Sequence, residues 1–506
     1  MTQSQFNSFL SLSILVALVM SGCTPATPSP TPAPTLAPTL TPARFEAADC
    51  KFQVPAGISY KVECGNLSVP EDRSQPDSPL IQLHVAIVRS QSQNPAADPV
   101  VFLQGGWSYP TLTYMAYLLP QFKDVLENRD LIFFDQRGVG YSQPSLDCPE
   151  IPTQVYQDTV QNVGRDERVQ NYIHAAQTCH DRLIGEGVNL AAYTTATTAA
   201  DVNDLRIALG YSEWNLYGVS WGTTLALTVM HHFPTGVRSV ILDSVYPPQE
   251  NVFVEGAVTV ERSFNLLAER CAADAECNRA YPDLIIVFYD LVAQLDANPR
   301  GPMNGNGLIE TLWGWLYSSE MISWVPMYIY DFHNGNWASL PSQPVSLALH
   351  DKPGPDTPSE GKKFSVICGE EVRFTSPEEI EAANATVNPR LVEFFNEPIF
   401  TICSFWGAKP ADPVEHEAVV SDIPALILQG DYDPATPPAW AKLAVETLSK
   451  AQYFEFPGIS HGVLGAGLDG GTCSRKIVDA FLADPKSVSD SSCLEKMKPF
   501  FMTGSY

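Results

Sequence analysis

Short runs of apolar residues, rich in β-branched and aromatic side chains, recur along the chain. Several lack the polar alternation of a half-exposed strand, which is typical of strands buried on both faces of a parallel sheet. The runs are Ile81–Val88, Val100–Leu103, Leu131–Phe134, Trp214–Tyr217, Val240–Leu242, Ala425–Leu428 and Tyr453–Phe456. Helix-like segments fall between them, such as Ala200–Leu209 and Pro438–Leu448. This alternation predicts an α/β fold with a mostly parallel sheet and right-handed crossovers.

The strand pattern stops at about residue 248 and resumes near residue 421. The stretch between is rich in helix-like and aromatic residues and contains a Pro/Gly-rich interruption, Lys352-Pro353-Gly354-Pro355. A chain of 506 residues is long enough for a large core and for two or more domains. We therefore expect a core made of residues 45–247 and 421–506, with a mainly helical cap inserted at 248–420.

Residues 1–23 resemble an export signal that ends in a bacterial lipobox. The apolar run at residues 9–20 is too short to span a bilayer comfortably, and Met20-Ser21-Gly22-Cys23 places a lipidation candidate, Cys23, after small residues. No Lys or Arg precedes the run, which leaves a plain secretory signal or an uncleaved anchor as alternatives. The Pro/Thr-rich residues 24–44 predict an extended spacer. We expect a lipoprotein on the outer face of a bacterial membrane, or alternatively a secreted protein.

The chain is strongly acidic, with 30 Lys and Arg against 57 Asp and Glu and a formal net charge of −27. Such a surface repels phosphate backbones, so nucleic-acid partners are not expected. The charge favours solubility, with a weak bias toward cationic substrates.

The cysteine count agrees with export. Of 11 cysteines, removal of the lipidated one leaves an even number, as disulfides require. The simplest pairing joins neighbours, with free buried thiols as the alternative. The pairs are Cys50 with Cys64, Cys148 with Cys179, Cys271 with Cys277, Cys368 with Cys403, and Cys473 with Cys493. None has the spacing of a metal site, and we expect neither a metal nor another cofactor.

The string Gly218-Val219-Ser220-Trp221-Gly222 lies between the strand-like run Trp214–Tyr217 and the helix-like run Leu225–Met230. This is the setting of a nucleophile elbow, a sharp strand-to-helix turn that exposes a serine hydroxyl. Larger side chains at the two flanking glycines would collide with the neighbouring strand or helix. The pattern favours Ser220 as a nucleophile in an α/β-hydrolase fold.

A serine nucleophile needs a histidine base oriented by a carboxylate, and in this fold the chain order is Ser, Asp, His. Asp433 follows the strand-like run Ala425–Leu428, and His461 is the one histidine after it. Asp431 remains an alternative acid. The adjacent pair His231-His232 points in two directions on a helix and is interpreted as surface, not as a metal site.

An oxyanion hole needs two backbone N–H donors. One is expected from Trp221, the residue after the nucleophile, and the other from the Gly105-Gly106-Trp107 loop that follows Val100–Leu103. An ordinary tight turn is the alternative for these glycines.

Several motifs together resemble the prolyl iminopeptidase and tripeptidyl-aminopeptidase-like serine peptidases, over about residues 45–500. Gln104–Ser108 is similar to their HGGPG loop, and Asp135–Ser142 to their DQRGxGxS signature. Gly430–Pro437 resembles the segment that carries the acid, and the ending with Cys473 and Cys493 resembles their C-terminal region. Asp135 and Arg137 are interpreted as structural braces.

The resemblance implies an exported serine aminopeptidase that acts near the free N-terminus of short peptides, with Ser220, Asp433 and His461 as the triad. In this family acidic cap residues bind the substrate ammonium. The Cys368–Glu371 segment resembles that part of the cap, which makes Glu370, and next Glu371, the candidates, with surface glutamates as the alternative.

The Gln104–Ser108 loop departs from the family's HGGPG pattern, because Trp107 and Ser108 stand in place of Pro and Gly. We expect this departure to affect substrate specificity more than the catalytic triad. A carboxylesterase or lipase of the same fold is the nearest alternative function, because fold and triad do not determine the leaving group. An inactive surface binding protein is the alternative from another class.

The cap aromatics are candidates for an apolar pocket or, for most of them, for cap core; they are Trp313, Trp315, Tyr317, Trp324, Tyr328, Tyr330 and Trp337.

Overall fold

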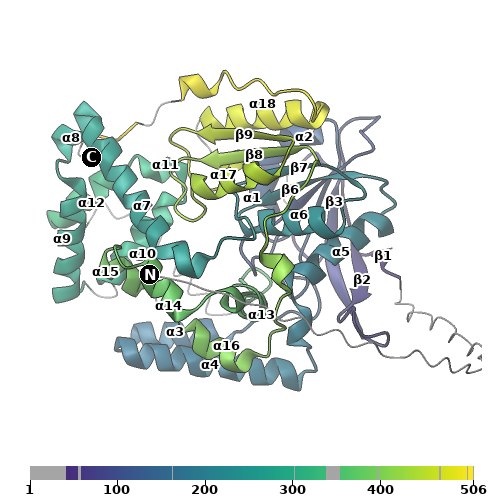
Figure 1. Cartoon of the computed structure of the whole chain (residues 1–506), viewed down its shortest axis with the longest axis horizontal. Coiled ribbons are helices and arrows are strands. Elements are labelled where there is room, and N and C mark those ends of the chain that lie inside the picture. The colour runs from purple at the N-terminus through teal and green to yellow at the C-terminus, as the bar shows by residue number, and fades with distance from the viewer. Residues whose placement is uncertain are drawn as a thin grey trace, which may run out of the picture. The chain divides into compact units, whose positions relative to one another are not determined.

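The computed structural model describes residues 42–54, 58–161, 163–300, 303–337, 354–395, 398–466, 469–497 and 500–504. The described residues from 42 onward group into one compact unit (Figure 1). The predicted export signal, Cys23 and most of the spacer lie outside the described residues, so those expectations stay predictions. Within the described ranges, every helix is too short or too polar to cross a membrane.

Nine strands form one sheet in the order β1-β2-β3-β5-β4-β6-β7-β8-β9. Their bounds are β1 Arg44–Ala47, β2 Val62–Pro70, β3 Leu80–Val88, β4 Val100–Leu103, β5 Leu131–Phe134, β6 Trp214–Val219, β7 Val237–Asp243, β8 Ala425–Gly430 and β9 Ala451–Phe456. The first three pairs, β1–β2, β2–β3 and β3–β5, are antiparallel, and all later neighbours are parallel. The predicted α/β class and all seven predicted strands are confirmed. The pattern missed β1 and β2, because edge strand β1 is mostly exposed and β2 interleaves polar residues.

Helices cover both faces of the sheet, which explains the apolar runs without alternation. Apolar side chains of α5, α6 and α17 pack on one face, and those of α1, α2 and α18 on the other. The helices outside the 248–420 stretch are α1 Met115–Leu118, α2 Lys123–Leu126, α3 Glu150–Val160, α4 Arg165–Gly185, α5 Thr195–Ala208, α6 Trp221–His232, α17 Pro438–Thr447 and α18 Asp469–Ala483.

Between β7 and β8 the described residues are mainly helical and add no strand to the sheet, as the pattern predicted. These helices are α7 Val252–Ala273, α8 Ala275–Ala280, α9 Leu284–Ala297, α10 Gly305–Leu316, α11 Ser319–Ile322, α12 Val325–His333, α13 Glu360–Gly369, α14 Pro377–Ala383, α15 Pro389–Phe395 and α16 Ile399–Trp406. A core of their own joins α7, α9, α10 and α12.

Two helices outside that insertion belong with it in space. Helices α3 and α4, which precede the nucleophile strand, lie beside α13 and α16 (Figure 1), and side chains of all four share an apolar cluster. Sequence order alone assigned α3 and α4 to the core, because packing between distant segments leaves no local pattern. The boundaries of a separate cap at 248–420 stay a prediction.

Five disulfides pair the ten cysteines of the described part, in the neighbour-to-neighbour arrangement that the sequence suggested. The Cys148–Cys179 bond ties the start of α3 to α4, and Cys368–Cys403 ties α13 to α16. Such cross-links reduce the entropy of the unfolded chain and so stabilise the cluster that α3, α4, α13 and α16 form.

Candidate active site

Ser220 occupies the turn between β6 and α6 with φ of 56° and ψ of −129°, a conformation that is strained for any residue with a side chain. The predicted need for glycine on both sides is confirmed. A Cβ on Gly218 would lie 2.4 Å from the carbonyl oxygen of Gly222, and one on Gly222 would lie 2.1 Å from that of Leu103. The elbow therefore requires glycine at both positions, because its backbone packs directly against other backbone atoms.

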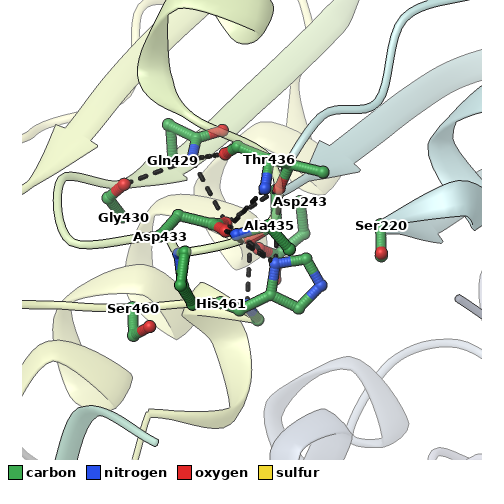
Figure 2. Close-up of polar contacts among 12 residues, drawn as sticks. Ser220, Asp243, Gln429, Gly430, Asp433, Ala435, Thr436, Ser460 and His461 are labelled. Carbon is green, nitrogen blue, oxygen red and sulfur yellow. Dashed lines mark hydrogen bonds and ion pairs between the residues drawn. The ribbon is translucent and has the colours of Figure 1, made fainter. Parts of the chain in front are cut away.

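Asp433 and His461 meet where the loops after β8 and β9 converge. The Nδ1 atom of His461 lies 3.0 Å and 2.9 Å from the two carboxylate oxygens of Asp433. Backbone N–H groups of Ala435 and Thr436 donate to Asp433 Oδ1 at 2.9 Å and 2.8 Å, and the Thr436 hydroxyl donates to Oδ2 at 2.8 Å. These bonds hold the carboxylate against the ring (Figure 2).

The alternative acid, Asp431, has a different position. Its carboxylate pairs with Arg270 of α7 at 2.7 Å and accepts the N–H of Gly458 at 2.9 Å. The Asp431 carboxylate thus connects α7 to the loop after β8 instead of contacting the imidazole. Between the two aspartates that the sequence offered, the geometry favours Asp433.

Figure 2 shows Ser220 on the side of the imidazole that faces away from Asp433. Ser220 and His461 line the same cavity. Both residues are described, and the structure has no hydrogen bond between the Ser220 hydroxyl and the ring. Apo enzymes often show such loose contacts, which tighten when substrate is bound.

Burial alone would lower the pKa of His461, but the carboxylates of Asp433 and, further away, Asp243 outweigh it and raise that pKa above its ordinary value of 6.5. The same pairing keeps the pKa of the buried Asp433 below its usual range, although desolvation opposes this. The pair thus favours a negative carboxylate beside a ring that accepts a proton readily, which suits a general base.

Asp243 at the end of β7 is a site residue that the sequence analysis missed. It is fully buried, and its carboxylate accepts the N–H groups of Val463 at 2.8 Å and Leu464 at 3.0 Å and the hydroxyl of Tyr217 at 2.5 Å. The next residue, Ser244, accepts the N–H of Gly462 at 2.9 Å. These bonds fix the three residues that follow His461, while the Asp243 carbonyl accepts the Ser220 N–H at 2.9 Å. The one signal for this role was an acidic residue at the end of an apolar strand.

The predicted oxyanion donors lie beside the nucleophile. Gly106, Trp107 and Trp221 line the cavity together with Ser220, and Gly106 has a φ of 65°. A Cβ on Gly105 would lie 2.9 Å from Ser220 Cβ. The loop backbone therefore passes the serine at a distance that only glycine permits. These contacts place the loop as an oxyanion hole requires, and its function stays a prediction.

A cavity of about 800 Å³ opens at Ser220 and His461. Its walls come from the oxyanion loop, the elbow, the start of α7, helices α10, α13 and α17, and the loop after β8. Of the seven cap aromatics, Trp313 and Tyr317 line it, and the Tyr317 ring packs edge-on against His461 with centroids 5.2 Å apart. The other five pack against the cap core, as the core interpretation predicted; they are Trp315, Trp324, Tyr328, Tyr330 and Trp337.

Glu370 and Glu371, predicted to bind the ammonium group, are not among the described residues that line this cavity. The Glu370 carboxylate accepts the Thr195 N–H at 2.6 Å and the Thr195 hydroxyl, and burial raises its pKa. Glu371 accepts the Tyr246 hydroxyl at 2.7 Å, and burial raises its pKa to about 8. The Glu370 carboxylate thus faces the first turn of α5, which does not favour it as an ammonium ligand, and the roles of Glu370 and Glu371 stay predictions.

Two acids of the described residues do line the cavity, Glu310 on α10 and Glu360 on α13, and Glu310 is the better candidate. It makes no hydrogen bond or ion pair with another described residue, and desolvation raises its pKa. Glu360, also in the wall, already faces Lys363 at 3.4 Å. The sequence signal for Glu310 was its being the one charged residue in the 12-residue helix Gly305–Leu316.

The DQRGxGxS-like segment braces the site from behind, as predicted. Asp135 accepts the N–H groups of Thr111 at 2.7 Å, Leu112 at 3.0 Å and Tyr141 at 2.8 Å, which fixes the chain after the oxyanion loop. Arg137 is fully buried and binds both carboxylate oxygens of Asp201 at 2.6 Å and 2.7 Å. Neither is among the cavity's lining residues.

The sheet, the elbow after its central strand and the facing Asp–His pair define the α/β-hydrolase class. Residues 98–281 match the family described as alpha/beta hydrolase fold, and residues 392–493 match TAP-like protein. The chain therefore has the α/β-hydrolase fold and is a hydrolase, and its C-terminal part is similar to TAP-like proteins.

Three curated relatives are similar to this chain. Serine protease Hip1 of Mycobacterium tuberculosis is 24% identical over 467 residues, covering 83% of this chain and 84% of that protein. Tripeptidyl aminopeptidase of Streptomyces lividans is 30% identical over 198 residues, covering 38% of this chain and 36% of that protein. Carboxylesterase B of Mycobacterium tuberculosis is 25% identical over 452 residues, covering 83% of this chain and 84% of that protein.

Proposed function

We propose that the chain is a serine aminopeptidase that cleaves short peptides near their free N-terminus. The Ser220 hydroxyl attacks the scissile carbonyl while Nε2 of His461 takes its proton, and Asp433 stabilises the imidazolium that forms. N–H groups of Trp221 and of the Gly106-Trp107 loop bind the oxyanion. His461 then gives the proton to the leaving amine. In the second half-reaction His461 takes a proton from water, which attacks the acyl-enzyme, and returns that proton to the Ser220 oxygen as the acid product leaves.

One observation carries the choice of a peptide with a free amine: an unpaired carboxylate in the wall of the cavity. An ammonium group that enters a capped site loses its hydration, which is costly unless a carboxylate meets it. Glu310 has this position and has no protein partner among the described residues. The serine protease and aminopeptidase names of two relatives support the same choice.

The spacing along α10 suggests how many residues are removed. Glu310 precedes Tyr317, whose ring touches His461, by seven residues, or about 10 Å of helix axis at 1.5 Å per residue. An extended peptide covers about 3.3 Å per residue, so about three residues bridge that distance. A tripeptide unit between the ammonium group and the cut fits this spacing.

The test compares Glu310→Gln with Glu370→Gln on three substrates: a free-amine tripeptide anilide, its N-acetylated form and a small neutral ester. Glu310→Gln should lower kcat/KM for the free-amine substrate about tenfold or more, since a hydrogen bond to a charged group contributes about 1.5–3 kcal/mol. Ester hydrolysis should hardly change. Glu370→Gln serves as the matched control and should not discriminate between the substrates. Equal losses on all three substrates after Glu310→Gln would contradict the ammonium role.

A carboxylesterase is the second candidate, because much of the cavity wall is aromatic or aliphatic and a relative carries that name. The same three substrates decide between the two. A wild-type enzyme that prefers the ester and the N-acetylated peptide to the free-amine peptide would favour the esterase.

We further propose that the enzyme is exported and anchored by a lipid on Cys23, with the Pro/Thr-rich segment as a spacer. Such an anchor holds a catalytic body off the membrane while short peptides reach it from outside. Cys23→Ser should release the protein from membranes or block its processing. Unchanged fractionation and unchanged mass of the mature chain would refute the lipid anchor.

A further inference from the structure

Gly314 stands within α10 at a position where glycine has no structural explanation. Glycine is the poorest helix former after proline. The usual reasons to keep one are a left-handed φ or close packing. Gly314 has no left-handed φ, and a Cβ built on it would meet nothing within 4 Å. The helix itself would therefore be more stable with alanine at this position.

Gly314 does line the active-site cavity. It lies four residues after Glu310 and three before Tyr317, and this spacing places all three on one face of the helix. The face thus carries a carboxylate at one end, the ring that touches His461 at the other, and open backbone between them. Open space above a glycine is where a bound chain can approach a helix most closely.

Hydrogen bonds tie α10 and the start of α11 to the loops of the triad, which opposes displacement of this face by a substrate. The Trp313 indole N–H donates to the carbonyl of Pro434 at 3.2 Å. At the C-terminal end, the Ser460 hydroxyl donates to the Leu316 carbonyl, and the Ser460 N–H donates to the Ser319 hydroxyl at 2.9 Å. Ser460 directly precedes His461, which couples the position of α10 to that of the base.

We propose that Gly314 is a specificity-determining residue: it opens the α10 face so that the middle residue of an N-terminal tripeptide passes between Glu310 and Ser220. This inference rests on the proposed aminopeptidase function and deepens it. A methyl group at residue 314 projects into the space that the peptide fills, and such overpacking is unfavourable because both the helix and the triad are fixed. Hydrolysis should decrease most for substrates whose middle residue has a large side chain.

The experiment uses Gly314→Ala and a matched control, Gly185→Ala. Gly185 ends α4, lies outside the lining of the cavity, and would also hold a Cβ that meets nothing within 4 Å. Both substitutions should raise Tm, because alanine favours the helix and limits the unfolded chain. Gly314→Ala alone should lower kcat/KM about fivefold or more for a tripeptide anilide with leucine in the middle. The loss should be smaller with glycine there, and a small neutral ester should be unaffected.

The outcomes separate this inference from the function on which it rests. If the wild type prefers free-amine tripeptides and Gly314→Ala leaves that activity unchanged, Gly314 has no role and the aminopeptidase function stands. If Gly314→Ala impairs the ester as much as the peptide, the residue supports the fold and the inference is wrong. If the wild type shows no preference for free-amine peptides, the proposed function itself fails, whatever the variant does.

Discussion

Replacing Asp243 with asparagine tests the most consequential site residue that the motif analysis missed. The wild-type carboxylate offers two oxygens to Val463 N–H, Leu464 N–H and the Tyr217 hydroxyl, directly behind the base. Asparagine keeps one oxygen and turns an NH2 group toward a backbone N–H. The change therefore removes a negative charge near His461 and breaks one of the two bonds that fix the chain after it.

The magnitudes follow from these contacts. A buried N–H without an acceptor costs about 1–3 kcal/mol, so the free energy of unfolding should fall by about that amount. A displacement of the base by about 1 Å can lower the rate about 100-fold, which sets the scale for the loss in kcat. Besides Asp433 and Asp243, the described groups that face the ring are the hydroxyls of Ser220 and Thr436 and the Tyr317 side chain, and none of these is charged near neutral pH. Loss of the Asp243 charge therefore lowers the pKa of His461.

The assay is the pH profile of kcat/KM on a neutral ester. His461 must be neutral to act as base, so the wild-type activity falls below a pKa that lies above 6.5. In Asp243→Asn this acidic limb should move to lower pH while the plateau drops. Ser244→Ala is the control, because it removes the acceptor of the Gly462 N–H without a change of charge. In this variant the maximal kcat/KM should fall while the acidic limb of the pH profile stays at the same pH. An unmoved limb in Asp243→Asn would refute the electrostatic part of the argument.

Three further predictions concern the triad and a buried acid. Ser220→Ala should lower kcat about 10⁴–10⁶-fold with an unchanged Tm, and near wild-type turnover would exclude Ser220 as nucleophile. Asp433→Asn should lower kcat about 10⁴-fold by favouring the wrong tautomer of the base, whereas Asp431→Asn should be mild; steady-state kinetics showing the reverse order would identify the other aspartate as the acid. Glu371 has a folded-state pKa of about 8 against an ordinary 4.5, so the folded state binds the extra proton between these values and stability falls as pH rises through that window. Glu371→Gln should thus raise Tm more at pH 8 than at pH 5, and an equal shift at both would show that burial of the charge is not the cause.

The sequence alone was sufficient to predict features that depend on residues close together in the chain. The elbow around Ser220 was readable because its serine and two glycines lie within five residues, although the clash that requires Gly222 comes from Leu103 on another strand. The choice of His461 followed from chain order, and the disulfide pairs followed from proximity along the chain. Buried strands were readable because helices on both faces demand continuous apolar runs, whereas the exposed edge strand β1 carried no such pattern.

Tertiary structure decided everything that depends on where separate segments meet. Glu370 and Glu310 are both acids of the helical insertion, and the segment around Glu370 resembled the expected one. Only packing shows that the Glu370 carboxylate is bound by Thr195 while Glu310 lines the cavity. Asp243 likewise acquires its role from Val463 and Leu464, some 220 residues away. Local sequence determines which backbone conformations and reactive groups are possible, but the side that a side chain faces depends on long-range packing, and that is set only when the whole core closes.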